Sequence, residues 1–124
     1  MKHTDTIQEL REWAAMVIMG WKPDTLNRYY INFKDSPYGN LQIKSDILGW
    51  QPDNPSTGQI WMFVEGMRKL GWRLRVDDYG IYFCATWMMP DKENKTWAIQ
   101  LAEHRDTNLC IAILKAAKAT EVKP

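Results

Sequence analysis

The sequence predicts an α+β protein, a three-layer α/β/α sandwich with three helices and a mainly antiparallel sheet of about five strands. Three segments repeat apolar residues at helical spacing, which predicts the helices. Short turns join several strand-like segments, and strands joined in this way are antiparallel. Residues 80–88 are apolar or aromatic at nearly every position, which favours a central strand covered on both faces.

The length and net charge of the chain indicate the number of domains and exclude some kinds of partner. The chain has 124 residues, 45% of them hydrophobic, which is enough for one core. We therefore expect a single domain over 1–124, with its core over about 5–119. The net charge of +1 gives no field that would drive nucleic-acid binding. No signal-peptide pattern or membrane-length apolar run is found, so we expect a cytoplasmic protein with no membrane partner.

Two of the predicted helices lie near the ends of the chain. Residues 5–19 carry apolar residues three and four positions apart, after Thr4 or Asp5 as the cap and before Gly20 as the stop. The last helix is expected to begin after Asp106, whose carboxylate can accept from free amides of the first turn.

The middle helix has the clearest start. Ser56 and Gln59 have the spacing of a capping box, in which each side chain bonds the other residue's backbone N–H. Gly71 is expected to end this helix. A glycine within a helix costs about 1 kcal/mol relative to alanine, so Gly66 indicates a close backbone approach where the helix crosses the sheet.

Five segments have the composition or the alternation of strands. Between the segments 72–77 and 80–88, Asp77–Gly80 is expected to form the tight turn of a hairpin. The five segments are 28–34, 41–43, 72–77, 80–88 and 96–103.

The sequence contains no phosphate loop, zinc-protease helix or nucleophile elbow, so we expect neither catalysis nor a metal or cofactor. Cys84 and Cys110 lie in apolar surroundings, which favours two buried thiols over a disulfide. A weaker alternative is a small hydrolase acting through Glu103, His104 and Asp106. The same residues also fit a solvated turn before a helix.

Tryptophans and a basic cluster are the candidate binding features. The chain has seven tryptophans, more than a core of this size readily buries. Trp13 and Trp61 fall off the apolar stripes of their helices, which favours interface or ligand contacts, or packing at the rim of the sheet. Arg73 and Arg75 share a strand face and could bind a phosphate or carboxylate together, although a solvated outer face has the same pattern.

Three ordered stretches resemble the phage ABA sandwich domain family. They are the helix end Val17–Lys22, the connection Trp50–Thr57 with the helix that follows it, and the last strand with the helix through Cys110–Ala116. The resemblance implies an α/β/α sandwich and a bacteriophage or prophage origin. It implies no established activity.

With this resemblance, we expect a small phage accessory protein that works by binding in the cytoplasm of the bacterial host. One version is counter-defence by sequestration of a nucleotide-type signal or another anionic ligand. Arg73 and Arg75 would then hold the phosphate, and Tyr30 and Trp50 would stack on the base. The alternative is a protein–protein interaction module that blocks a host protein or forms a homo-oligomer, with no small-molecule ligand.

Overall fold

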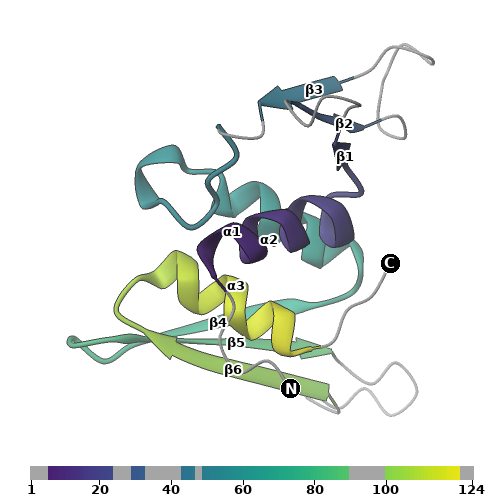
Figure 1. Ribbon diagram of the computed structural model, residues 1–124. Helices are drawn as coiled ribbons and strands as arrows, with labels where there is room; N and C mark the ends of the chain where they lie inside the picture. The colour runs from purple at the N-terminus through teal and green to yellow at the C-terminus, as the bar shows by residue number, and fades with distance from the viewer. Residues whose placement is uncertain (1–5, 24–28, 33–42, 47–48, 90–99, 121–124) are drawn as a thin grey trace.

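The computed structural model describes residues 6–23, 29–32, 43–46, 49–89 and 100–120. It shows an α+β protein (Figure 1). The helices are α1 (Ile7–Trp13), the π-helical segment η1 (Ala14–Ile18), the 3₁₀ turn η2 (Pro55–Thr57), α2 (Ile60–Lys69) and α3 (Leu109–Ala119). The strands are β1 (Lys22–Pro23), β2 (Tyr29–Asn32), β3 (Ile43–Asp46), β4 (Arg73–Asp78), β5 (Phe83–Met89) and β6 (Gln100–Asp106).

These strands form two antiparallel sheets of three, in the orders β1-β2-β3 and β4-β5-β6. The described residues therefore do not show a single sheet of about five strands. Each predicted strand overlaps an observed one, and the predicted residues 28, 33–34, 41–42 and 96–99 lie outside the described part of the chain. Sequence neighbours pair with one another, whereas an irregular connection and α2 separate β3 from β4.

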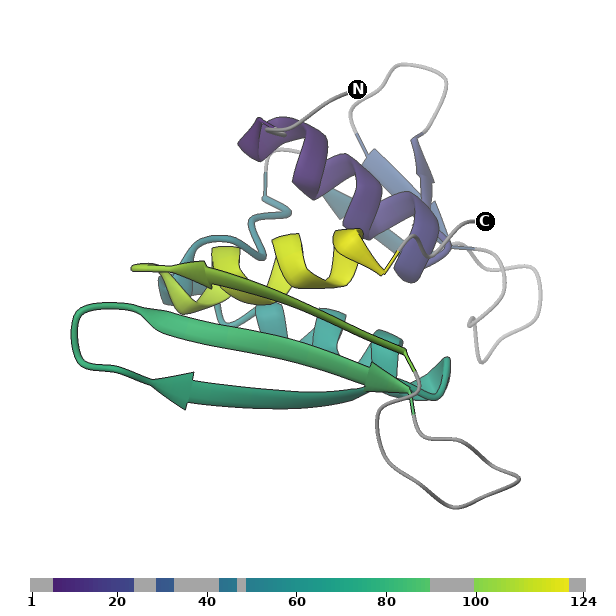
Figure 2. The ribbon, with the colours of Figure 1, turned by 90° about the horizontal axis from the view of Figure 1, so that it is seen from below.

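The helices lie on one face of the sheet β4-β5-β6. In both views α2 and α3 cover this face, and α1 packs on the far side of these two helices (Figures 1 and 2). Within the described residues no helix lies on the opposite face, which we call the outer face. The segment 80–88 was expected to need cover on both sides. Its first three residues belong instead to the turn before β5.

Strand register assigns alternate residues to the two faces. Leu74 lies opposite Trp87 on the covered face, where the Trp87 indole N–H donates to the backbone carbonyl of Ile113 in α3 at 3.0 Å. Arg75 lies opposite Thr86 on the outer face. The alternation of β4 thus separates an apolar side from a charged side, as the sequence predicted for this strand.

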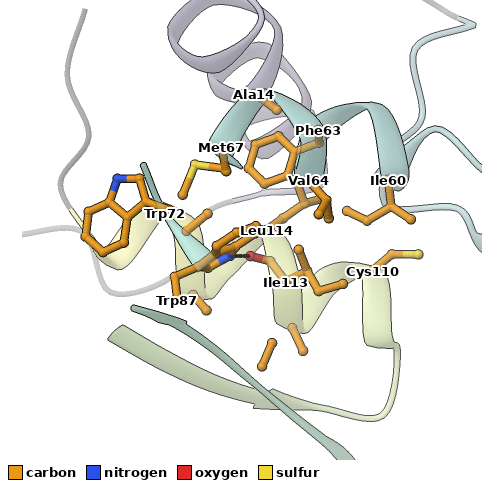
Figure 3. Packing of buried hydrophobic residues seen from close by; sticks show 14 of the residues in the cluster. Ala14, Ile60, Phe63, Val64, Met67, Trp72, Trp87, Cys110, Ile113 and Leu114 are labelled. Atoms are coloured by element: carbon orange, nitrogen blue, oxygen red, sulfur yellow. Dashed lines mark hydrogen bonds between the residues drawn. The ribbon is translucent and has the colours of Figure 1, made fainter. Parts of the chain in front are cut away.

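The core joins α2, α3 and β5 around Trp87 (Figure 3). The rings of Phe63 and Trp87 meet edge to face, with centroids 6.4 Å apart. Met67, Ile113 and Leu114 are fully buried beside them. Because these large side chains come from three elements, they fix the position of both helices on the sheet.

The first helix begins at Thr6, which forms a capping box with Glu9. The predicted caps Thr4 and Asp5 lie outside the described residues. After Trp13 the helix widens into the π-helical segment η1 and ends before Gly20, whose φ of 72° is in the left-handed region. The predicted stop at Gly20 is confirmed, and the physical reason is the positive φ that this ending requires.

Gly66 makes a close approach to η1 and not to the sheet, which corrects the prediction. A Cβ at Gly66 would lie 2.9 Å from Cγ2 of Ile18 and 3.3 Å from Sδ of Met19. Glycine therefore allows α2 to pack closely against the π-helical segment. The sequence indicated the close approach but not the partner, because the partner comes from a distant part of the chain.

The predicted capping box at Ser56 is not formed. Residues 55–57 make the turn η2, and Gly58 follows with a φ of 68°. The Gln59 side chain instead accepts from the backbone N–H of Gln51 at 2.6 Å and donates to the carbonyl of Gly49 at 3.0 Å. Gln59 thus ties the connection to the start of α2, a use that its spacing from Ser56 did not indicate.

The cap of α3 also differs from the prediction. Asn108 is the N-cap, and its side-chain oxygen accepts from the N–H of Cys110 at 2.8 Å. Asp106 belongs to β6 and accepts from the N–H of Asn108 at 2.8 Å. The cap thus lies two residues later than predicted, and Asp106, the last residue of β6, supports the capping residue.

A bidentate ion pair fastens the connection 49–59 to the helices. Asp53 accepts from Nε of Arg11 at 2.7 Å and from its terminal nitrogen at 3.0 Å. The Asn108 side chain donates to the carbonyl of Asp53 at 3.1 Å. Asp53 is buried, and an Arg–carboxylate fork of this kind holds both partners in one geometry. Three segments far apart in the sequence thus meet at one residue.

Candidate interaction surfaces

The predicted ligand residue Trp50 is a core residue. Its side chain is 1% exposed, and its indole N–H donates to the carbonyl of Arg11 at 2.9 Å. Its ring meets the ring of Trp21 edge to face, with centroids 4.8 Å apart. A ring packed in this way offers no free face for a nucleotide base. Trp50 therefore anchors the connection 49–59.

The structure brings together two of the other three predicted ligand residues. Arg73 and Arg75 share the outer face of β4, as predicted. Nε of Arg75 lies 3.2 Å from a carboxylate oxygen of Asp77, and Arg73 donates to the carbonyl of Trp72 at 3.0 Å. Tyr30 is on β2, in the other sheet, and its side chain lies outside what is described.

Of the alternative hydrolase residues, His104 and Asp106 share one face of β6, and Glu103 lies on the other. His104 lies opposite Ala85 on the covered face, whereas Glu103 lies opposite Thr86 on the outer face. Burial lowers the pKa of His104, the charge of Lys115 lowers it further, and Asp106 raises it. A His and a Glu on opposite faces of one strand cannot act on the same atom.

Both cysteines are free and buried. Cys84 is 3% exposed although it lies on the outer face, opposite Arg105. Its thiol lies 3.7 Å from a carboxylate oxygen of Glu103. The prediction of two buried thiols is thus confirmed. No group of three or more His, Cys, Asp or Glu side chains that could hold a metal lies in the described part of the chain.

The tryptophans divide between core and surface. Trp13 is half-buried against Phe63, and Trp97 lies outside the described residues. Trp61, which lies off the apolar stripe of α2, is 57% exposed. The buried ones are Trp21, Trp50, Trp72 and Trp87.

An open apolar groove lies between η1 and α2. Its volume is about 320 Å³, and Gly66 forms part of its wall. Met62 and Leu70 line it and are each about half exposed, at 47% and 48%. Methionine side chains adapt to different partners, so this groove suits an apolar side chain of another molecule. Its full lining is Ile18, Met19, Met62, Glu65, Gly66, Lys69 and Leu70.

A basic recess adjoins this groove. It has a volume of about 450 Å³ and is lined by Glu65, Arg68, Lys69 and Arg73. Glu65 and Lys69 line both hollows, so the two adjoin along α2. Arg68 lies 3.8 Å from Glu65, an exposed contact that holds little energy. We call the groove and the recess together the α2 surface.

The turn between β4 and β5 forms a second exposed apolar site. The N–H of Tyr79 donates to the carbonyl of Tyr82 at 3.0 Å, and Gly80 has a φ of 85°. The turn therefore spans Tyr79–Tyr82, two residues later than the predicted turn Asp77–Gly80. Ile81 is 80% exposed and Tyr79 is 55% exposed. We call residues 77–82 the hairpin tip.

Contacts within the hairpin tip hold it in shape. A carboxylate oxygen of Asp78 accepts from the N–H of Gly80 at 2.8 Å. The rings of Tyr79 and Tyr82 lie 5.1 Å apart, and the Arg105 guanidinium lies 5.5 Å from the Tyr82 ring centroid. This site was not predicted from the sequence. The signal was present in Ile81, a large apolar residue directly after the turn glycine.

In comparisons with known proteins, no family model, no curated protein and no solved structure matched this chain. The resemblance to the phage ABA sandwich domain family therefore stays a prediction. No helix in the described ranges is long and apolar enough to cross a membrane.

Proposed function

We propose that this protein acts by binding another protein, chiefly through the α2 surface. The observation that carries this proposal is the grouping of exposed large apolar side chains around α2. Trp61 and Met62 on α2, and Leu70 directly after its last residue, are each between 47% and 57% exposed. Met62 and Leu70 line the groove, and Trp61 is the sequence neighbour of Met62. Tryptophan and methionine are enriched where proteins meet.

The open shape of the α2 surface favours a protein partner over a small molecule. Sites for small ligands enclose most of the ligand surface. The two hollows around α2 are open, and the aromatic residue expected to stack on a base, Trp50, is buried elsewhere. An interaction module needs no enclosed pocket and no catalytic group.

The biological setting is part of the same proposal. A phage-encoded accessory protein that blocks a host protein in the bacterial cytoplasm would need an exposed apolar surface of this kind. That setting rests on the resemblance to the phage family. The full three-layer sandwich also stays a prediction, because the described helices lie on one face of the sheet β4-β5-β6.

A second candidate is an anionic small ligand in the basic recess. Arg68, Lys69 and Arg73 supply three positive groups there against the single carboxylate of Glu65. Guanidinium and ammonium groups bind phosphate strongly when several converge. Arg75 is outside this recess and pairs with Asp77. Because Arg73 lines the recess and Arg75 does not, substituting each arginine separately is a sharper test than substituting both together.

That test is nucleotide binding by native mass spectrometry. We expect Arg73→Ala to lose any nucleotide adduct and Arg75→Ala, the matched control on the same strand face, to keep it. Wild-type protein without an adduct, across cyclic and linear nucleotides, would remove the small-ligand candidate.

The protein-binding proposal is tested by photo-crosslinking in bacterial cells. A photoreactive amino acid replaces Trp61, and the control variant carries it at Gln8, an exposed position on α1. We expect a discrete crosslinked protein with the probe at position 61 and none with the probe at position 8. Equal crosslinking at both positions would contradict a specific surface around α2.

A further inference from the structure

The hairpin tip and the α2 surface lie at opposite ends of β4. Arg73 lines the basic recess and begins the strand, and Asp78 ends it within the hairpin tip. A strand of six residues is about 17 Å long between its first and last Cα atoms. Figures 1 and 2 show the turn extending away from the end of α2 that leads into β4. One molecule therefore cannot place its hairpin tip on its own α2 surface.

The two sites have complementary charge. Residues 77–82 contain two carboxylates, Asp77 and Asp78, and no basic residue. Asp77 is already paired with Arg75, and the Arg105 guanidinium lies over the Tyr82 ring. Asp78 is exposed at the end of the strand, where one carboxylate oxygen accepts from the N–H of Gly80. The basic recess has three cationic side chains and one carboxylate. A carboxylate at the front of the hairpin tip would meet this excess of positive charge.

The two sites also complement each other in shape. The hairpin tip projects Ile81, the most exposed large hydrophobic residue among those described, with Tyr79 beside it. The apolar groove on α2 is a hollow of about 320 Å³, lined in part by Met62 and Leu70. A projecting aliphatic side chain with an aromatic neighbour is the kind of anchor that fills such a groove. The recess that would receive the carboxylate shares Glu65 and Lys69 with the groove that would receive Ile81, so the two sites adjoin.

We propose that the chain associates head to tail, with the hairpin tip of one molecule docked on the α2 surface of a second copy. This inference rests on the proposed function and names the partner as the chain itself. The two contacting patches are different, so each molecule keeps one free tip or one free α2 surface after pairing. Such heterologous contacts continue into rings or filaments unless they are blocked.

The test uses two exposed substitutions, one in each patch. Ile81→Arg removes the projecting side chain and adds a positive charge that the recess repels. Leu70→Asp places a charge in the apolar groove. We expect the wild-type mass in sedimentation equilibrium to rise with concentration beyond that of a dimer. Each variant alone should lower the association constant by roughly tenfold or more.

Mixing the two variants tests whether the hairpin tip of one molecule docks on the α2 surface of another. The Ile81→Arg variant keeps an intact α2 surface, and the Leu70→Asp variant keeps an intact hairpin tip. Their mixture should therefore form a one-to-one heterodimer that grows no further. A closed two-fold dimer with reciprocal contacts would differ in the wild type, whose mass would stop at that of a dimer. In a dimer built from one patch on itself, only one of the two substitutions would weaken association. Leu101→Ser, at a residue 56% exposed on β6 outside both sites, is the control and should associate as wild type does.

Two outcomes would overturn the inference. Wild-type protein that stays monomeric into the millimolar range excludes a second copy as the partner. Association that survives both substitutions, with the fold unchanged by circular dichroism, excludes these two patches. The in-cell crosslink then decides the proposed function separately. A crosslinked protein of different mass keeps the function with another partner, whereas no crosslink at position 61 removes both.

Discussion

The two faces of the sheet β4-β5-β6 come from the same strands but differ in what buries their side chains. The covered face is packed by α2 and α3, and its central residue Trp87 is fully buried. The outer face has no helix over it among the described elements, yet Cys84 on that face is 3% exposed. Long charged side chains on neighbouring strands can bury a small residue with their aliphatic stems. Burial on a strand therefore does not by itself require a covering layer.

The largest loss of stability is expected from a substitution on the covered face. Trp87→Ala should cost about 3–5 kcal/mol, because it removes a large core side chain and leaves the carbonyl of Ile113 without its donor. Thr86→Ala, on the adjacent residue of the outer face, should cost less than about 1 kcal/mol. Urea denaturation measures both. Similar losses of unfolding free energy in the two variants would contradict the claim that the covered face carries more of the stability than the outer face.

A smaller effect is expected in the helical layer above the covered face. Gly66→Ala gains about 1 kcal/mol in helix propensity, but the new Cβ meets Ile18 at 2.9 Å, an overlap that costs about 1–3 kcal/mol. We expect a net loss of up to about 2 kcal/mol. In an Ile18→Ala background the same substitution should become neutral or stabilising. If Gly66→Ala lowers stability by the same amount in the Ile18→Ala background, overlap with Ile18 is not the cause.

A pH dependence is expected from the edge of the covered face. Burial and Lys115 lower the pKa of His104 below its usual 6.5, although Asp106 opposes this shift. The unfolded chain then binds the proton more readily than the folded one. Stability should fall as pH falls through 6.5, and the loss should be complete below the folded pKa. His104→Gln should flatten this part of the stability curve, and a slope that persists would assign the dependence to other groups.

The smallest effect on stability is expected on the outer face. Arg105 lies directly opposite Cys84, and Glu103 lies 3.7 Å from its thiol. Arg105→Ala should change stability by less than about 0.5 kcal/mol. It should nevertheless speed the reaction of Cys84 with a thiol reagent, measured in a Cys110→Ala background. Arg75→Ala is the matched control, and equal rates in the two variants would mean that Arg105 does not shield Cys84.

Local signals in the sequence predicted many of the elements. The periodicity of 5–19 and the stops at Gly20 and Gly71 correspond to helix ends in the structure, where both glycines have positive φ. The alternation of β4 predicted its charged and apolar faces. These predictions succeed because backbone conformation and burial pattern depend on residues a few positions apart.

Predictions that depended on distant partners were less accurate. The Gln59 side chain bonds the backbone of Gly49 and Gln51, so it does not form the expected capping box with Ser56. Trp50 was expected at a ligand site, but the carbonyl of Arg11 and the ring of Trp21 hold it in the core. An aromatic residue in an irregular connection has the same local pattern whether it is exposed or buried. Its environment is set by segments that the local sequence does not contain.

The sequence by itself determined the α+β class and the places where most helices and strands occur. Each of these follows from local propensity and from the side-chain period of a helix or strand. Only the tertiary structure decided that the helices lie on one face, that Gly66 meets Ile18, and that the hairpin tip and the α2 surface lie at opposite ends of β4. The reason is physical, since packing joins side chains that are distant along the chain and selects one arrangement among several with the same pattern.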